Sequence, residues 1–210
     1  MANKEIEDFI TDLQNCEQNF SDVENIYSPK TEGSENNVNN LRLYLNKMLE
    51  LKPKYMIVGE APGYRGCRWS GIPFTSEKII VTNDFFNKKY KIRIRNGKKP
   101  QSEASATIVW NCLDSLGLYP LMWNAFPFHP YKNNKTNSNR YPNKDELKFG
   151  EKILRKLISI YSISDENIIA VGKKAEKSLS SFQGFSGKEV RHPANNGKNE
   201  FIKGMTGLLK

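Results

Sequence analysis

The chain has 210 residues, of which 38% are hydrophobic and 26% charged, a composition typical of one folded domain and not of a disordered chain. No apolar run approaches the roughly 18–20 residues of a membrane span, and the N-terminus lacks the apolar segment of a signal peptide, so we expect a cytoplasmic protein. The net charge of +9 favours an anionic partner, although a solubilising surface would carry the same charge.

The three cysteines, Cys16, Cys67 and Cys112, are widely spaced and form no CxxC pair. This spacing argues against a disulfide framework and against a zinc ribbon, and three thiols are too few for the usual four ligands of an iron–sulfur cluster. We therefore expect reduced, structural cysteines and no metal or other cofactor.

The N-terminal quarter of the chain predicts helices. Apolar residues recur at helical spacing in residues 5–27, which predicts a pair of helices with one apolar face. After a polar loop at 29–37, residues 40–51 predict an amphipathic helix that Pro53 ends. We expect this N-terminal part, residues 1–52, to complete one face of a sheet, with docking of a partner as the alternative.

Three later segments each have a short apolar run followed by polar or glycine residues: 55–63, 121–128 and 167–175. Such runs are typical of buried strands, and the stretches between them at 103–116 and 143–161 have helical patterns. The alternation predicts an α/β fold, a three-layer sandwich with a central, largely parallel short sheet flanked by helices. We expect a single domain over residues 1–210, with its core in 53–210.

Residues 85–100 predict an additional element. The apolar Tyr90, Ile92 and Ile94 alternate with basic residues, and Asn96-Gly97 is typical of a hairpin turn. We expect a basic β-hairpin inserted into the α/β domain. The basic residues that alternate along it are Lys91, Arg93 and Arg95.

The first predicted strand ends in the turn GEAPG, which carries one carboxylate, Glu60. Gly59 and Gly63 permit a tight turn with close backbone approach, and Pro62 makes it rigid. A carboxylate held there can orient water or face a developing cation, while the structural alternative is a cap for the following turn or helix. Ligands of parallel sheets gather outside the carboxyl ends of the strands, where we expect both Glu60 and Asn124.

Three further residues combine a suitable side chain with a defined setting. Phe74 follows Pro73 in a rigid turn, where its ring can stack on a nucleic-acid base or belong to the core. Asn124 offers a donor and an acceptor, as reading the amide edge of a pyrimidine requires, or it closes a turn after its strand. His192 can donate to an oxygen that becomes negative in a transition state, or it can be structural.

Taken in order, the motifs GEAPG, GIPF, NAFPFHP and VRHPA resemble those of the uracil-DNA glycosylase superfamily over about residues 54–205. GEAPG resembles the first motif of the iron–sulfur branch, and SNRYP at 138–142 resembles the NRxP that follows the second motif there. The cysteines that ligate the cluster are absent, so the resemblance implies a cluster-free member.

The resemblance also implies roles for individual residues. Glu60 would assist hydrolysis, and His192 would contact an oxygen of the departing base. Phe74 would stack on the extruded base, and Asn124 would read the uracil edge. The base-binding segment around Glu60 would consist of Gly59, Ala61 and Pro62.

The implied function is base excision repair: a monofunctional, monomeric N-glycosylase that extrudes uracil from DNA, hydrolyses its N-glycosidic bond and leaves an abasic site. Basic side chains are expected to hold the DNA phosphates: Arg65, Arg68, Arg191, Lys91, Arg93 and Arg95. Two alternatives stay open, a glycosylase for another deaminated base and a catalytically inactive DNA-binding relative. The joint presence of Glu60, Asn124 and His192 argues against the second. The lack of a GxxxxGK[ST] phosphate loop argues against a nucleotide-hydrolysing enzyme.

Overall fold

The structure is a computed structural model that describes residues 2–16, 20–92 and 99–209. At its centre lies a four-stranded sheet in the order β3-β2-β5-β6, in which every neighbouring pair is parallel. Its strands are β2 (Met56–Gly59), β3 (Leu121–Asn124), β5 (Ile168–Val171) and β6 (Lys188–Val190). The first three lie within the three predicted apolar segments and are buried along their whole length.

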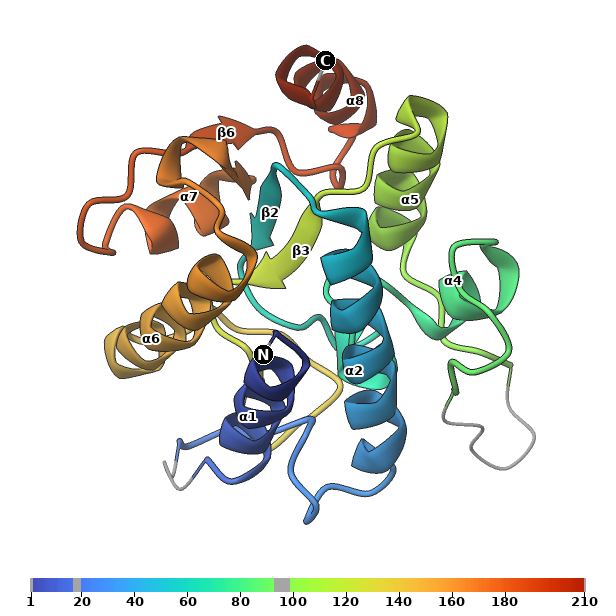
Figure 1. The fold of residues 1–210 in the computed structure, drawn as a ribbon. Coiled ribbons are helices and arrows are strands. Elements are labelled where there is room, and N and C mark those ends of the chain that lie inside the picture. Colours follow the sequence, from blue (N-terminus) through green and yellow to red (C-terminus); the bar gives the residue numbers. More distant parts are fainter. Residues whose placement is uncertain (1, 17–19, 93–98, 210) are drawn as a thin grey trace.

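Helices cover both faces of this sheet, so the predicted three-layer α/β fold is confirmed. In Figure 1, α6 and α7 lie on one side of β2 and β3, and α2, α5 and α8 lie on the other. These helices are α2 (Ser34–Leu51), α5 (Ala104–Leu116), α6 (Lys144–Tyr161), α7 (Lys173–Leu179) and α8 (Lys198–Leu209). Shorter helices are α3 (Cys67–Ser70), α4 (Glu77–Thr82) and a 3-10 turn at Asp165–Asn167.

The ends of the long helices follow from local sequence. Helix α6 begins with a capping box, in which the Asn143 side chain accepts from the Glu146 N–H at 2.9 Å and the Glu146 carboxylate accepts from the Asn143 N–H at 2.8 Å. Helix α5 ends at Gly117, whose φ of 62° is the left-handed conformation that glycine favours. Each helix in the described ranges is too short or too polar to span a bilayer.

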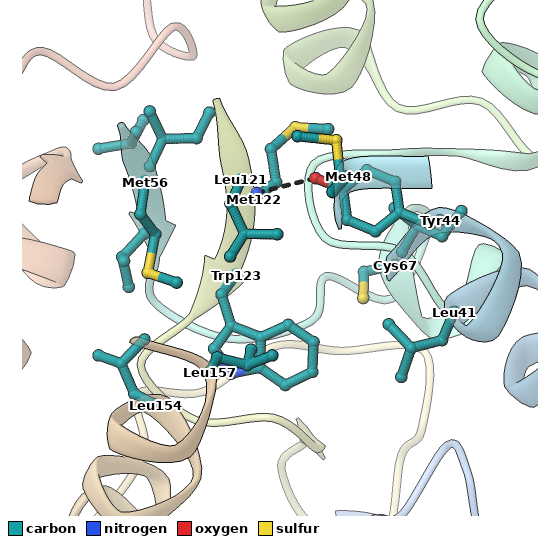
Figure 2. Packing of buried hydrophobic residues seen from close by; sticks show 14 of the residues in the cluster. Leu41, Tyr44, Met48, Met56, Cys67, Leu121, Met122, Trp123, Leu154 and Leu157 are labelled. Atoms are coloured by element: carbon teal, nitrogen blue, oxygen red, sulfur yellow. Dashed lines mark hydrogen bonds between the residues drawn. The ribbon is translucent and has the colours of Figure 1, made fainter. Parts of the chain in front are cut away.

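Helix α2 covers the outer edge of β3, the strand that borders the sheet beside β2 (Figure 2). The Tyr44 hydroxyl accepts a hydrogen bond from the backbone N–H of Met122 at 2.8 Å, which satisfies a donor at this free edge. On α1 (Ala2–Gln14), Phe9 lies edge to face against Trp123, with ring centroids 5.4 Å apart. The N-terminal helices therefore share one hydrophobic cluster with the sheet.

The predicted pair of helices in residues 5–27 is wrong. Among the described residues of this range only α1 is an α-helix, and Val23–Glu24 form strand β1, antiparallel to β4 (His129–Pro130). The Asn25 side chain donates to the Leu13 carbonyl at 2.8 Å, so a residue outside the helix provides the hydrogen-bond partner for a carbonyl of its last turn. The apolar residues beyond that point, Phe20 and Val23, pack against the core from outside a helix, so their spacing does not indicate a second helix.

The turn of the predicted basic hairpin lies outside the described residues, together with Arg93 and Arg95. The described flanks, 85–92 and 99–100, contain turns and no strand. Phe86 packs between Tyr90 and Trp110, with ring centroids 4.9 Å from both. This segment is therefore anchored by its aromatic residues to α5.

Candidate functional site

A cavity of about 540 Å³ opens at the carboxyl ends of the sheet strands, the expected place for a ligand in a parallel sheet. It collects residues from the turns after β2, β3 and β5 and from the loop after β6. Eight of the residues predicted from sequence line it: Gly59, Glu60, Ala61, Pro62, Phe74, Asn124, Arg191 and His192. Segments far apart in the chain thus meet at one place.

Gly59 forms the floor on which Asn124 and Phe74 converge. A Cβ atom on Gly59 would lie 2.6 Å from Oδ1 of Asn124 and 2.9 Å from Cζ of Phe74. Any larger residue would therefore displace the amide, the ring or both. The three residues form a compact surface with one apolar face and one amide.

Phe74 has a φ of 55°, which is uncommon for a bulky side chain and costs conformational energy. The Ser70 hydroxyl stabilises the turn, because it accepts from the Ile72 N–H at 3.1 Å and lies 2.7 Å from the Thr75 carbonyl, to which it can donate. The strained turn presents the ring to the cavity, where the side chain stays partly exposed.

Glu60 lies directly after β2, with its side chain 21% exposed at the cavity wall. Its backbone is fixed by a hydrogen bond from the Phe126 N–H to the Glu60 carbonyl at 3.1 Å. The carboxylate pairs with the Lys174 ammonium at 3.4 Å. Burial raises the pKa of Glu60, and the charge and hydrogen bond of Lys174 oppose that rise.

His192 enters the cavity because Gly172 leaves room for it. A Cβ on Gly172 would lie 2.7 Å from the Cβ of His192, and Gly172 has a φ of 89°, which disfavours any other residue. The backbone N–H of Ala194 donates to Nδ1 of His192 at 3.1 Å. Burial, followed by the charges of Arg191 and Lys174, lowers the pKa of His192. The neutral ring thus carries its proton on Nε2.

The basic residues expected at DNA are found in different environments. Arg65 and Lys91 are exposed, and neither lines the cavity. Arg191 is exposed at the cavity wall, where its Nε lies 3.5 Å from Glu200. These three side chains can reach a polyanion from the surface.

Arg68 does not fit the expected role. Its side chain is buried, and its guanidinium donates to the carboxylate of Glu24 on β1, which is itself mostly buried. It also lies over the Trp69 ring, 4.9 Å from the centroid. The short sequence distance between Arg65 and Arg68 hides this difference: Arg65 is exposed in the turn before α3, whereas Arg68 is buried on α3.

Four charged residues of the cavity wall were not predicted as site residues: Glu103, Arg140, Lys173 and Lys174. Glu103 immediately precedes α5, and a Cβ on Gly63 would lie 2.6 Å from its Oε1. Its carboxyl group therefore lies against the GEAPG turn. Burial raises the pKa of Glu103 to about 7. Neither Glu103 nor Lys174 has a distinctive sequence signal, because Lys and Glu at the start of a helix are usually solvated.

The wall residues Asn139 and Arg140 belong to the SNRYP stretch noted in the sequence. The Asn139 side chain accepts from the Tyr64 N–H at 3.0 Å and so fixes the loop after Glu60. Arg140 donates from both terminal nitrogens to the buried Glu146 carboxylate, at 2.7 Å each. Both residues support the shape of the cavity.

Comparison with known proteins identifies the family. A family model of the uracil DNA glycosylase superfamily matches residues 47–204, most of the chain, and the protein belongs to this superfamily. The crystal structure of SMUG2 from Pedobacter heparinus has the same fold, with a TM-score of 0.72, 16% sequence identity, and coverage of 99% of this chain and 96% of that one. No curated protein matches the sequence.

Proposed function

We propose that the protein is a DNA glycosylase that hydrolyses the N-glycosidic bond of uracil in DNA and leaves an abasic site. The observation that carries this proposal is the convergence of Glu60, Phe74, Asn124 and His192 on one cavity of about 540 Å³. A carboxylate, an aromatic ring, an amide and an imidazole can together orient water, stack on a base, read its edge and stabilise the departing base, and the chain belongs to the uracil DNA glycosylase superfamily.

The base would enter the cavity after extrusion from the DNA stack, because its glycosidic bond is shielded inside a duplex. Phe74 would stack on the base, an interaction worth about 1–3 kcal/mol. The Asn124 amide would pair with the donor and acceptor of the uracil edge. Cytosine presents the opposite pattern there, so a fixed amide would leave buried polar groups unpaired and reject it.

The chemistry would be divided between the two sides of the breaking bond. As the C1′–N1 bond breaks, the sugar becomes cationic and the uracil anionic. Glu60 would face the sugar cation and orient the water that attacks C1′, and His192 would donate from Nε2 to the uracil oxygen that gains negative charge. The attacking water forms the new bond to C1′ and passes its proton to Glu60, while the electron pair of the broken C1′–N1 bond leaves with the uracil anion, which then takes up a proton from solvent. Because water and not a side chain bonds to C1′, no covalent enzyme intermediate forms.

Exposed basic side chains would hold the phosphates of the DNA on either side of the extruded nucleotide. Arg191 lines the cavity, and Arg65 and Lys91 are exposed elsewhere on the surface. Arg93 and Arg95 remain candidates by sequence. We propose that the protein acts as a monomer, since one chain supplies all the groups named for the reaction.

The test is release of free base from single- and double-stranded oligonucleotides that contain one uracil. We expect release by the wild type and a loss of about 10²–10⁴-fold in Glu60→Gln, which keeps the shape of the side chain and removes its charge. Glu35→Gln, at an exposed position on α2, is the matched control and should retain activity. Folded, DNA-binding protein that releases no uracil would refute the proposal and direct attention to oligonucleotides with other deaminated bases.

A further inference from the structure

The cavity wall holds a cation that the mechanism above does not use, Lys174 near the start of α7. Its Nζ lies 3.4 Å from Oε2 of Glu60. The Lys174 side chain is 71% exposed, whereas that of Glu60 is 21% exposed. The pair therefore joins a mostly buried carboxylate to an ammonium group that stays in contact with solvent.

The other cations of the described cavity wall have different ion-pair partners. These pairs are Arg140–Glu146, Lys173–Glu176, Lys173–Glu189 and Arg191–Glu200. The second carboxyl group of the wall, Glu103, lies against the turn at Gly63 and Gly66. Within this part of the structure, Lys174 is therefore the cation that is paired with Glu60.

The Lys174 charge acts on both groups to which the proposed function assigns the chemistry. For Glu60, burial raises the pKa and Lys174 lowers it. His192 lies on the same cavity wall as Lys174, and a Cβ on Gly172, two residues before Lys174, would lie 2.7 Å from the Cβ of His192. Burial lowers the pKa of His192, and the charges of Arg191 and then Lys174 lower it further. A single ammonium group thus favours an ionised carboxylate and a neutral imidazole over the same pH range.

We propose that Lys174 is a positioning residue of this site, which holds Glu60 as the anion and His192 as the neutral imidazole. The catalytic meaning of this inference rests on the proposed function. An anionic Glu60 stabilises a developing sugar cation, and a neutral His192 with its proton on Nε2 donates to the departing base. Lys174 does not touch the reacting atoms in this scheme; it acts through its two neighbours.

The first experiment follows His192 directly by NMR in the protein without DNA. The chain has only two histidines, so the ring signal of His192 can be assigned with His192→Gln and titrated against pH. We expect Lys174→Met to move this titration to higher pH, because the removed charge opposed protonation. Lys174→Arg should keep the wild-type titration. The carboxyl carbon of Glu60, assigned with Glu60→Gln, should shift in the same direction in Lys174→Met.

Lys173→Met is the matched control for the loss of one positive charge. Lys173 is adjacent in sequence and 77% exposed, but its ion pairs are with Glu176 and Glu189 and not with Glu60. We therefore expect both titrations to stay at their wild-type positions in this variant. Equal shifts in Lys173→Met and Lys174→Met would show a general field effect and overturn the assignment to Lys174.

The second experiment measures base release against pH with saturating DNA. The acidic limb of kcat should move to higher pH in Lys174→Met, with a loss of about two- to fivefold on that limb and wild-type values at higher pH, as expected for one partly solvated ion pair. Unchanged NMR titrations in Lys174→Met would refute this inference even if uracil is released. If the two titrations move to higher pH in Lys174→Met as expected, but the wild type releases no uracil, the proposed function is refuted instead.

Discussion

Gly59 and Asn124 are register partners at the ends of β2 and β3, and a Cβ on Gly59 would lie 2.6 Å from Oδ1 of Asn124. The parallel pairing of the two strands therefore sets the position of the amide above the first residue of the GEAPG turn. The same hypothetical Cβ would lie 2.9 Å from Phe74. The absence of a side chain at Gly59 is thus a condition for both Asn124 and Phe74 to hold their places.

Gly59→Ala should impair base release more than it impairs folding. The added methyl group would push the Asn124 amide and the Phe74 ring out of position, and displacements of about 1 Å can cost about 10²-fold in rate. We expect kcat/KM for uracil release to fall by about tenfold or more. Gly207→Ala is the control, because Gly207 is exposed on α8 and a Cβ there would meet nothing within 4 Å. Equal activity of Gly59→Ala and wild type would argue against a base at this floor.

His192→Ala should lower kcat while leaving KM for DNA nearly unchanged. The hydrogen bond from Ala194 to Nδ1 leaves the Nε2 proton of the neutral ring available for the departing base. Removal of one such donor costs about 10²–10³-fold in kcat. Single-turnover kinetics with saturating DNA measures this directly. A rise in KM with unchanged kcat would show that His192 binds DNA and does not stabilise the transition state.

The sequence predicts the three apolar strands and fails on the fourth for a physical reason. Buried parallel strands consist of uninterrupted apolar residues, as in β2, β3 and β5, so composition alone marks them. Strand β6 reads Lys-Glu-Val, with one buried residue, and it becomes a strand through its pairing with β5. No local pattern reports such pairing in advance.

The residues of the site likewise divide into those that a local sequence pattern marks and one that only the folded chain reveals. Glu60, Phe74, Asn124 and His192 each lie in a turn rich in glycine or proline or at the end of an apolar strand, where a polar or aromatic side chain is conspicuous. Lys174 lies at the start of a helix, in a chain with many lysines. Its relation to Glu60 arises only when β2 and β5 pair, which brings the segments that follow them to one edge.

Arg65 and Arg68 should behave differently despite their closeness in sequence. Arg68→Met leaves the Glu24 carboxylate without its partner, and breaking a buried ion pair costs about 3–5 kcal/mol of unfolding free energy. Arg65→Met should leave stability within about 0.5 kcal/mol, because Arg65 is exposed. Urea unfolding measures both. If Arg65 contacts a phosphate, its variant should also reduce the salt dependence of DNA binding by about one counterion.

The raised pKa of Glu103 predicts a pH dependence of stability that is opposite to that of most carboxylates. Burial raises its pKa from 4.5 to about 7 in the folded protein. Between these values the folded state holds a proton that the unfolded state has lost, so the free energy of unfolding falls as pH rises. The stabilisation is complete below about pH 4.5 and is lost above about pH 7, and its full size is about 3 kcal/mol.

Glu103→Gln isolates this contribution, because the amide keeps the size of a protonated carboxyl group and does not ionise. As pH rises from 5 to 8, the free energy of unfolding of the wild type should fall relative to that of Glu103→Gln. At pH 8 the variant should be the more stable protein. Glu35→Gln, at its exposed position, should leave the pH profile unchanged. Parallel profiles for wild type and Glu103→Gln would mean that Glu103 ionises in its usual range. The carboxyl group would then lie against Gly63 and Gly66 as an anion.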